Sequence, residues 1–227
     1  MKIEVIVQNE KDARDAEKAG ADRLELVSAI NEGGLTPAYD TIKGVLESVT
    51  IPVFVMVRPH SRTFNYNAAD WSKIEEDVKM VKTLGAPGIV FGCLNENNEI
   101  NEATLSKVIN LIDGMGMTFH RAFDDVVNQE KAYQTLCSYK AVERILTSGG
   151  APKAEEGLNQ LQRLVNLSKE SGGPKILVGS GLNSDNVNAI HNVLQAKEYH
   201  FGSGVRVNGS FLYSIDSRKI GRIRELV

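Results

Sequence analysis

A histidine and an arginine follow one another at the end of an apolar segment near the middle of the chain. The segment reads Met117-Thr118-Phe119-His120-Arg121-Ala122-Phe123-Asp124. A histidine side chain can transfer protons near neutral pH or bind a metal ion, and both roles stay open for His120. Arg121 is suited to hold a carboxylate or phosphate group, and Asp124 supplies a carboxylate nearby. We therefore predict that this segment contributes to a catalytic or binding site.

Charged residues also interrupt other apolar segments. They are Glu4, Arg23, Glu25 and Arg58, and His200 lies in a similar setting two residues after Glu198. An unpaired buried charge is costly, so a structural network of ion pairs and a functional site are both open for Glu4 and Arg23. A functional role is favoured for Glu25 and Arg58 because they lie nearer the ends of their segments, whereas a structural role is favoured for His200.

Glycine-rich turns follow the last three apolar segments. Glycine lets the backbone approach an anion closely, and the loops after the last two strands of a barrel commonly bind phosphate. We predict an anion site there, with Arg206 beside it. The residues assigned to this site are Ser148, Gly149, Gly179, Ser180, Gly181, Gly202, Ser203 and Gly204.

The chain contains two cysteines. Cys93 follows an apolar segment and is placed to bind a soft metal ion such as copper, whereas Cys137 lies in a helical pattern. One metal ion cannot easily be shared between the two places. A small buried apolar side chain is favoured for both cysteines, more strongly for Cys137. The two cysteines form no disulfide framework and no CxxC motif, which favours a cytoplasmic protein with free thiols.

The positions of these residues depend on a repeating pattern of strands and helices. Eight short apolar segments alternate with helical patterns, which predicts parallel strands joined by right-handed crossovers. Eight such units in 227 residues predict one closed (β/α)₈ TIM barrel, a single domain over 1–227. The alternative, an open doubly wound sheet, would usually have a glycine-rich turn after the first strand, where Val7-Gln8-Asn9-Glu10 has none.

The predicted strands cover residues 2–7, 23–27, 53–57, 88–91, a run beginning at 117, 144–146, 175–178 and 199–201. Helices are expected over 12–19, after Thr36-Pro37, and over 70–84, 102–112, 129–138, 153–169, 185–194 and 217–226, with Thr36 and Asp70 as N-caps. The C-terminal ends of barrel strands meet at one mouth, where active sites lie. We therefore expect Glu25, Arg58 and His120 to gather there.

Composition excludes several classes of protein. Hydrophobic residues make up 42% and charged residues 24% of the chain, which is typical of a folded soluble domain. The net charge of −3 provides no basic surface for nucleic acid or an anionic membrane. No apolar run approaches the roughly 18 residues of a membrane span, and the first residues enter a strand pattern with no signal peptide.

The sequence resembles the CutC family, named for copper homeostasis, along essentially its whole length. The resemblance rests on six segments in the right order, which are 19–26 (AGADRLEL), 32–37 (EGGLTP), 51–59 (IPVFVMVRP), 90–92 (VFG), 118–124 (TFHRAFD) and 144–150 (RILTSGG). It implies a cytoplasmic (β/α)₈ barrel with a role in copper handling and a homodimeric assembly. The family's glutamate, arginine and His-Arg pair match Glu25, Arg58, His120 and Arg121.

One part of the family pattern differs here. The family often carries cysteines near the ends of strands 1 and 2, and the matching positions are Ile6 and Val27. The resemblance therefore leaves Cys93 and His120 as the candidate copper ligands.

Three functional hypotheses follow. The first is a copper-binding or copper-trafficking protein. The second is an enzyme acting on a small phosphorylated or carboxylated molecule. In it Arg58 and Arg121 hold the anion and Glu25 and His120 act as acid and base, with Asp124 in the same catalytic group. The third is a regulatory or scaffold protein that uses the barrel surface, and fold alone cannot choose among them.

Overall fold

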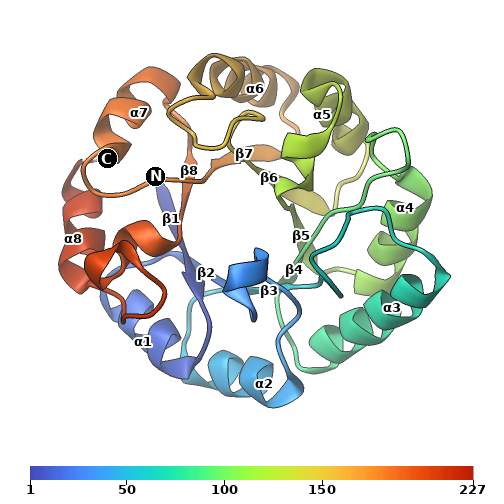
Figure 1. Cartoon of the computed structure of the whole chain (residues 1–227), viewed down its shortest axis with the longest axis horizontal. Helices are drawn as coiled ribbons and strands as arrows, with labels where there is room; N and C mark the ends of the chain where they lie inside the picture. Colours follow the sequence, from blue (N-terminus) through green and yellow to red (C-terminus); the bar gives the residue numbers. More distant parts are fainter. Residues whose placement is uncertain (227) are drawn as a thin grey trace.

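The centre of the molecule is a closed barrel of eight parallel strands, hydrogen-bonded in chain order. The computed structural model describes residues 1–226. Within these residues, eight α-helices surround the barrel and each follows one strand, as Figure 1 shows. The predicted (β/α)₈ TIM barrel is thus confirmed.

The observed strands agree with the predicted ones to within two residues at each end. They are β1 (Lys2–Val7), β2 (Arg23–Leu26), β3 (Val53–Met56), β4 (Gly88–Phe91), β5 (Gly116–Phe119), β6 (Val142–Thr147), β7 (Lys175–Val178) and β8 (Glu198–Phe201). The α-helices are α1 (Glu10–Lys18), α2 (Tyr39–Ser48), α3 (Ala68–Thr83), α4 (Glu102–Ile112), α5 (Gln129–Cys137), α6 (Leu158–Ser171), α7 (Val187–Leu194) and α8 (Ser217–Leu226).

Three predicted helix starts were wrong. Asn67 rather than Asp70 caps α3, because the two side chains form a capping box in which Asp70 occupies the third helical position. Thr36 caps no helix, since its hydroxyl group exchanges hydrogen bonds with the backbone of Arg58. Helix α6 begins at Leu158 instead of 153, because the preceding turn is held against the loop after β7 by the Ala154 N–H, which donates to the Ser180 carbonyl.

Charged side chains fill the part of the barrel interior that lies below its mouth, away from the C-terminal ends of the strands. Arg23 pairs with Glu4 and with Glu198, the second at 2.6 Å, and all three are almost fully buried. The guanidinium of Arg144 lies 4.5 Å from the ring centre of Phe54, which packs where Gly88 leaves room for it. The ionic network considered for Arg23 is therefore present, and it forms a floor beneath the mouth of the barrel.

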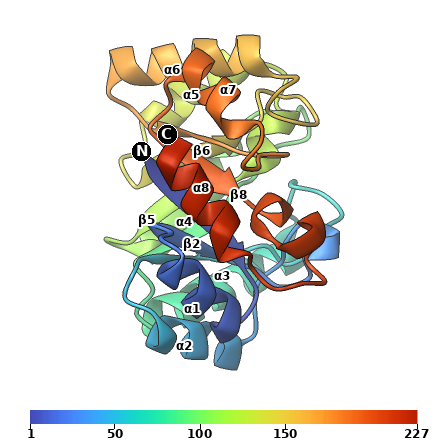
Figure 2. The ribbon, with the colours of Figure 1, turned by 90° about the vertical axis from the view of Figure 1, so that its left-hand side faces the viewer.

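Residues 202–216 form a loop with two short 3₁₀ turns at the end of the barrel where the turn after β2 also lies (Figure 2). Arg206 anchors this loop, because it is 2% exposed and its Nη2 lies 2.6 Å from Asp12 Oδ2. Arg206, which the sequence analysis placed beside an anion, is therefore already paired with Asp12 beneath the loop.

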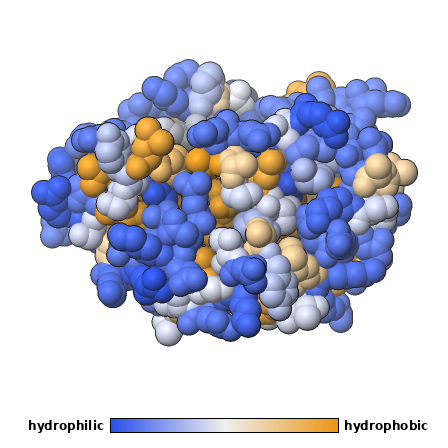
Figure 3. Space-filling view, turned by 60° about the horizontal axis from the view of Figure 1, so that its bottom comes forward, coloured by the Kyte–Doolittle hydropathy of each residue, from blue (hydrophilic) through white to orange (hydrophobic). Residues whose placement is uncertain are grey.

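The outer surface is mostly polar. On the face drawn in Figure 3, hydrophilic residues dominate, and most hydrophobic residues show in gaps among them near the centre of the view. Among residues 1–226, no helix combines the length and the apolar character needed to cross a membrane.

Candidate functional site

A cavity of about 550 Å³ opens at the C-terminal ends of the strands. It brings together nine of the predicted site residues, which are Glu25, Arg58, His120, Arg121, Ser180, Gly181, Gly202, Ser203 and Gly204. The other five lie outside its lining, and they are Cys93, Asp124, Ser148, Gly149 and Gly179. Because strand ends converge in a barrel, residues far apart in sequence share this one chamber.

Glu25 is a buried carboxylate with an unsatisfied oxygen. It is 3% exposed, and its Oε2 has no hydrogen-bond partner among the described residues. Burial raises the pKa of Glu25 to about 7; the negative charge of Glu4 adds to this rise, while His200 and Arg23 oppose it. A carboxyl group with this pKa can take up and release a proton near neutral pH.

His120 is held as a neutral imidazole. Its Nδ1 accepts the Ala122 backbone N–H at 3.1 Å, so the proton of the neutral ring is on Nε2. That Nε2 is buried without a partner in the described part of the chain. Burial lowers the pKa of His120 to about 3, and the positive charge of Arg58 contributes. His120 therefore offers an uncharged N–H donor.

The tautomer of His120 gives a first prediction. We expect the His120 ring to stay neutral, with its proton on Nε2, from pH 5 to 9, because protonation would place a second cation beside Arg58. Nitrogen-15 spectra of histidine-labelled protein measure this directly. His191, on the outer helix α7, is the internal comparison. A His120 signal that titrates near pH 6.5 would contradict the assignment.

Arg58 is a buried cation that has no carboxylate partner in the part of the chain that the structure describes. It is 8% exposed, and its guanidinium donates only to backbone carbonyls and lies 4.7 Å from the ring centre of Phe64. The accepting carbonyls belong to Glu32, Gly33, Gly34 and Ser61. The other buried arginines, Arg23, Arg144 and Arg206, all form ion pairs with carboxylates. The mouth thus holds a positive charge that an anionic ligand would balance.

Asp124 supports the mouth from outside the cavity. Its side chain is 6% exposed and pairs with Arg121, whose Nε lies 2.7 Å from Oδ2. It also accepts hydrogen bonds from the Thr147 hydroxyl and from the Ser148 and Gly150 N–H groups. Asp124 thereby joins the end of β5 to the turn after β6. Its predicted catalytic position, and the ligand-binding positions of Ser148 and Gly149, are therefore not at the cavity wall.

This arrangement gives a prediction about stability. Asp124→Ala is expected to lower the free energy of unfolding by about 3–5 kcal/mol, because it leaves buried donors without an acceptor. Chemical denaturation measures the change. Asp125→Ala is the matched control, since this neighbouring carboxylate is exposed, and its effect should stay within about 0.5 kcal/mol. Equal effects of the two substitutions would show that Asp124 has no such supporting role.

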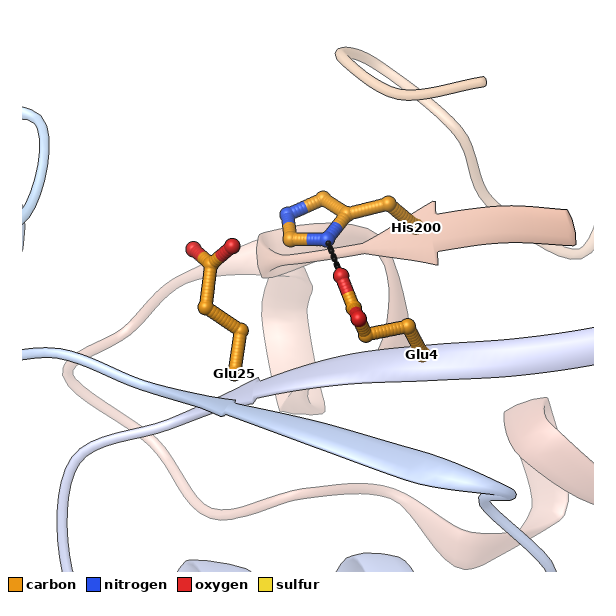
Figure 4. Close-up of side chains that lie close together, drawn as sticks. All are labelled: Glu4, Glu25 and His200. Carbon is orange, nitrogen blue, oxygen red and sulfur yellow. Dashed lines mark hydrogen bonds and ion pairs between the residues drawn. The ribbon is translucent and has the colours of Figure 1, made fainter. Parts of the chain in front are cut away.

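His200 and Glu4 complete the site beside Glu25 (Figure 4). His200 Nδ1 lies 2.7 Å from Glu4 Oε1, and one potential ligand atom from each of the three residues lies within 4.8 Å of the others. Burial opposes the charge on Glu4, but Arg23 and His200 outweigh it and lower the pKa of Glu4 to about 2. Burial likewise opposes the charge on His200, but Glu25 and Glu4 outweigh it and raise the pKa of His200.

The sequence favoured a structural role for His200, and the structure places it in the cavity wall. One signal could have suggested this. Glu4 is in register with both Arg23 on β2 and His200 on β8, and Glu25 lies two residues after Arg23 on the same face. Assuming closure of the barrel with β1 beside β8, the three side chains fall in adjacent layers of the interior.

The cysteines are not placed to bind copper in the mouth. Cys93 is 1% exposed within the hydrophobic core, its Sγ lies 3.4 Å from the Asn101 carbonyl oxygen, and burial raises the pKa of its thiol. Cys93, one of the two candidate copper ligands, therefore lies in the hydrophobic core and not in the wall of the cavity that His120 lines. Within residues 1–226, the one cluster of three potential ligands is Glu4, Glu25 and His200. Oxygen and nitrogen donors do not fit Cu(I), which prefers thiolate.

Comparison of the sequence with known proteins finds members of one family. The sequence model of the CutC family matches residues 1–205. A family protein CutC from Pectobacterium atrosepticum is 39% identical over 97% of this chain and 84% of its own length. The copper homeostasis protein cutC homolog of Homo sapiens is 37% identical over 87% of this chain and 71% of its own length.

Solved structures agree with the fold. The crystal structure of a CutC protein from Streptococcus agalactiae has a TM-score of 0.82 and 28% identity, covering 89% of this chain and 98% of that chain. A phosphoribosyl anthranilate isomerase from Thermotoga maritima has a TM-score of 0.64 with 14% identity, covering 99% of this chain and 97% of that chain. At that identity the second likeness concerns the barrel fold alone.

Proposed function

The chain belongs to the CutC family, and from that premise and the geometry of the mouth we propose that it is an enzyme that moves a proton on a small anionic carbonyl compound. One observation carries the proposal. The buried carboxylate of Glu25 and the buried Nε2–H of His120 line the same cavity, and each lacks a partner among the described residues. Such groups cost stability unless a ligand uses them.

The proposed reaction assigns one role to each group. The carboxylate or phosphate of the substrate lies near Arg58, whose positive charge holds it. Arg121 lines the same cavity, and its charge is shared with Asp124. Glu25 removes a proton from the carbon next to the carbonyl group. The electron pair of the broken C–H bond moves onto the carbonyl oxygen, where the Nε2–H of His120 stabilises the negative charge. A neutral imidazole suits this task, because it donates a hydrogen bond without giving up its proton.

The glycine turns after β7 and β8 support the anion from the opposite wall. Ser180, Gly181 and the run Gly202–Gly204 line the cavity. Backbone N–H groups at such turns can contact an anion. The substrate class proposed here is therefore a carboxylated or phosphorylated compound small enough for about 550 Å³.

An isotope experiment tests the enzyme proposal. Small keto acids and sugar phosphates are incubated with the protein in D₂O, and proton spectra follow loss of the signal from the carbon next to the carbonyl. We expect exchange with the wild type and with His191→Gln, whose histidine lies on the outer helix α7. His120→Gln should slow it by about 10²–10³-fold. The proposal fails if no such compound exchanges, or if His120→Gln exchanges at the wild-type rate.

Copper binding is the second candidate function. The human relative is named a copper homeostasis protein, and the cluster of Glu4, Glu25 and His200 offers donors of the kind that Cu(II) accepts. A competition titration with Cu(I) and Cu(II) tests it on the wild type, Cys93→Ala and Glu25→Gln. Tight Cu(II) binding lost in Glu25→Gln would favour copper. Dependence on Cys93 would restore the thiolate hypothesis. A cytoplasmic location and a homodimer, both implied by the family, stay predictions.

A further inference from the structure

Glu4 and His200 have no role in the reaction steps above, although they lie beside the proposed base. Figure 4 shows the imidazole of His200 between two carboxylates, with one ring nitrogen bonded to Glu4 and the other on the side of Glu25. The three side chains come from adjacent strands, β8, β1 and β2. Glu4 is 0% exposed, so its carboxylate cannot reach a ligand and acts through His200.

The hydrogen bond to Glu4 fixes the protonation of one ring nitrogen. An ionised carboxylate only accepts hydrogen bonds, so the Nδ1–H of His200 donates to Glu4 Oε1 across 2.7 Å. The other nitrogen, Nε2, is then the one that gains or loses a proton. It lies toward Glu25, and His200 lines the cavity. Glu4 thus orients His200 as a carboxylate orients a catalytic histidine in other enzymes.

Of the charged groups that face His200, Glu25 is the one not already bonded to another side chain. From β1 it faces Glu4, and from β2 it faces Glu25 and Arg23. Arg23 is already bonded to Glu4 and Glu198. On the side of β7, Gly179 packs against the ring of His200 and brings no charge.

We propose that Glu4, His200 and Glu25 form a proton relay in which His200 is a second catalytic residue. The inference rests on the proposed function. In this relay Glu25 begins as the carboxylate, and His200, whose Nδ1–H is held by Glu4 across 2.7 Å, begins with a proton on Nε2 as well. Glu25 takes the proton from the substrate carbon as the C–H electron pair moves onto the carbonyl oxygen, and His200 gives its Nε2 proton to that oxygen, so that the enol tautomer forms. Glu25 then passes its proton to Nε2, which restores the starting state without net gain or loss of protons.

The relay also defines the class of reaction. Two proton-transfer groups side by side allow a proton to leave one substrate atom and a different proton to arrive at another. This suits an isomerase that interconverts a carbonyl compound with its tautomer. A single carboxylate can also carry a proton between two atoms, so His200 is expected to speed formation of the tautomer more than hydrogen exchange at carbon.

The coupling within the relay can be measured without a substrate. The chain has four histidines, so the nitrogen-15 spectrum of histidine-labelled protein is simple, and His200→Gln assigns the signal. We expect the pKa of His200 to fall clearly in Glu25→Gln, because a negative charge beside the ring is lost, and to fall also in Glu4→Gln. The His191 signal should not move in either variant. An unchanged His200 titration in Glu25→Gln would overturn the relay.

The catalytic role is tested with a compound that the wild type exchanges in D₂O. In His200→Gln, hydrogen exchange at the substrate carbon is expected to persist within about tenfold, while formation of the isomer falls by at least about 10²-fold. Equal loss of both processes, or loss of neither, would overturn the assignment. Absence of any exchange with the wild type counts instead against the proposed function, and the titration still decides whether His200 and Glu25 are coupled.

Discussion

Replacing Glu25 by glutamine is expected to slow hydrogen exchange on a substrate by about 10²–10⁴-fold. Glutamine keeps the shape of the side chain and cannot accept a proton from carbon. The side chain is 3% exposed, so an isosteric change disturbs packing little. The rate is measured in D₂O by the loss of the proton signal of the substrate. An undiminished rate would show that another group is the base.

The same substitution should make the protein more stable at alkaline pH. The pKa of Glu25 rises from 4.5 to about 7 on folding, so ionisation is easier in the unfolded chain. Stability linked to this group is therefore complete below pH 4.5 and is lost as the pH rises through 7. Glutamine does not ionise, so at pH 8 Glu25→Gln should raise the free energy of unfolding by about 3 kcal/mol.

Denaturation at pH 4 and pH 8 separates this effect from a general change in packing. We expect almost no gain at pH 4, where Glu25 is protonated in both states. Glu96→Gln is the control, because this glutamate is exposed and should show no gain at either pH. A gain of equal size at both pH values would refute the electrostatic origin. Loss of activity together with increased stability is the expected signature of a residue kept for function.

The barrel and three residues of its cavity could be predicted from the sequence, because both depend on short local patterns. Each strand is a short apolar run bounded by turns, and parallel strands bring their C-terminal ends together. Glu25 lies inside such a run, and Arg58 and His120 lie within two residues of the end of one. Their direction therefore follows from the strand, and all three reach the cavity.

Residues farther into the loops were harder to place. Cys93 lies two residues beyond β4 and Asp124 five residues beyond β5, where turn geometry rather than strand alternation sets the direction of a side chain. The first points into the core and the second beneath the turn after β6. The contact between Glu4 and His200 joins residues 196 positions apart. It depends on the register that closes the barrel, which no local pattern in the sequence specifies.

Replacing Arg58 by glutamine is expected to remove the stabilisation that anions give to the protein. Arg58 provides the buried positive charge of the mouth, and its loss should weaken binding of a substrate anion by about 10²-fold or more. The measurement is the thermal shift produced by inorganic phosphate and by a small keto acid. Arg62→Gln is the matched control, because this arginine lies in the same loop with its side chain 73% exposed. Equal shifts in both variants would place the anion elsewhere.

Without an added anion, Arg58→Gln should have little effect on the free energy of unfolding. Arg58 has no carboxylate partner among residues 1–226, so burial of its charge is costly, and Arg58→Gln should cost little stability although the accepting carbonyls lose donors. The pKa of His120 should rise at the same time, since the charge of Arg58 helps to keep it low. A large loss of stability with no change at His120 would mean that Arg58 only braces the loop. If Arg58→Gln costs little stability and Glu25→Gln raises it, the charges of Arg58 and Glu25 do not serve folding. Both would then be explained by a role in binding or converting a ligand.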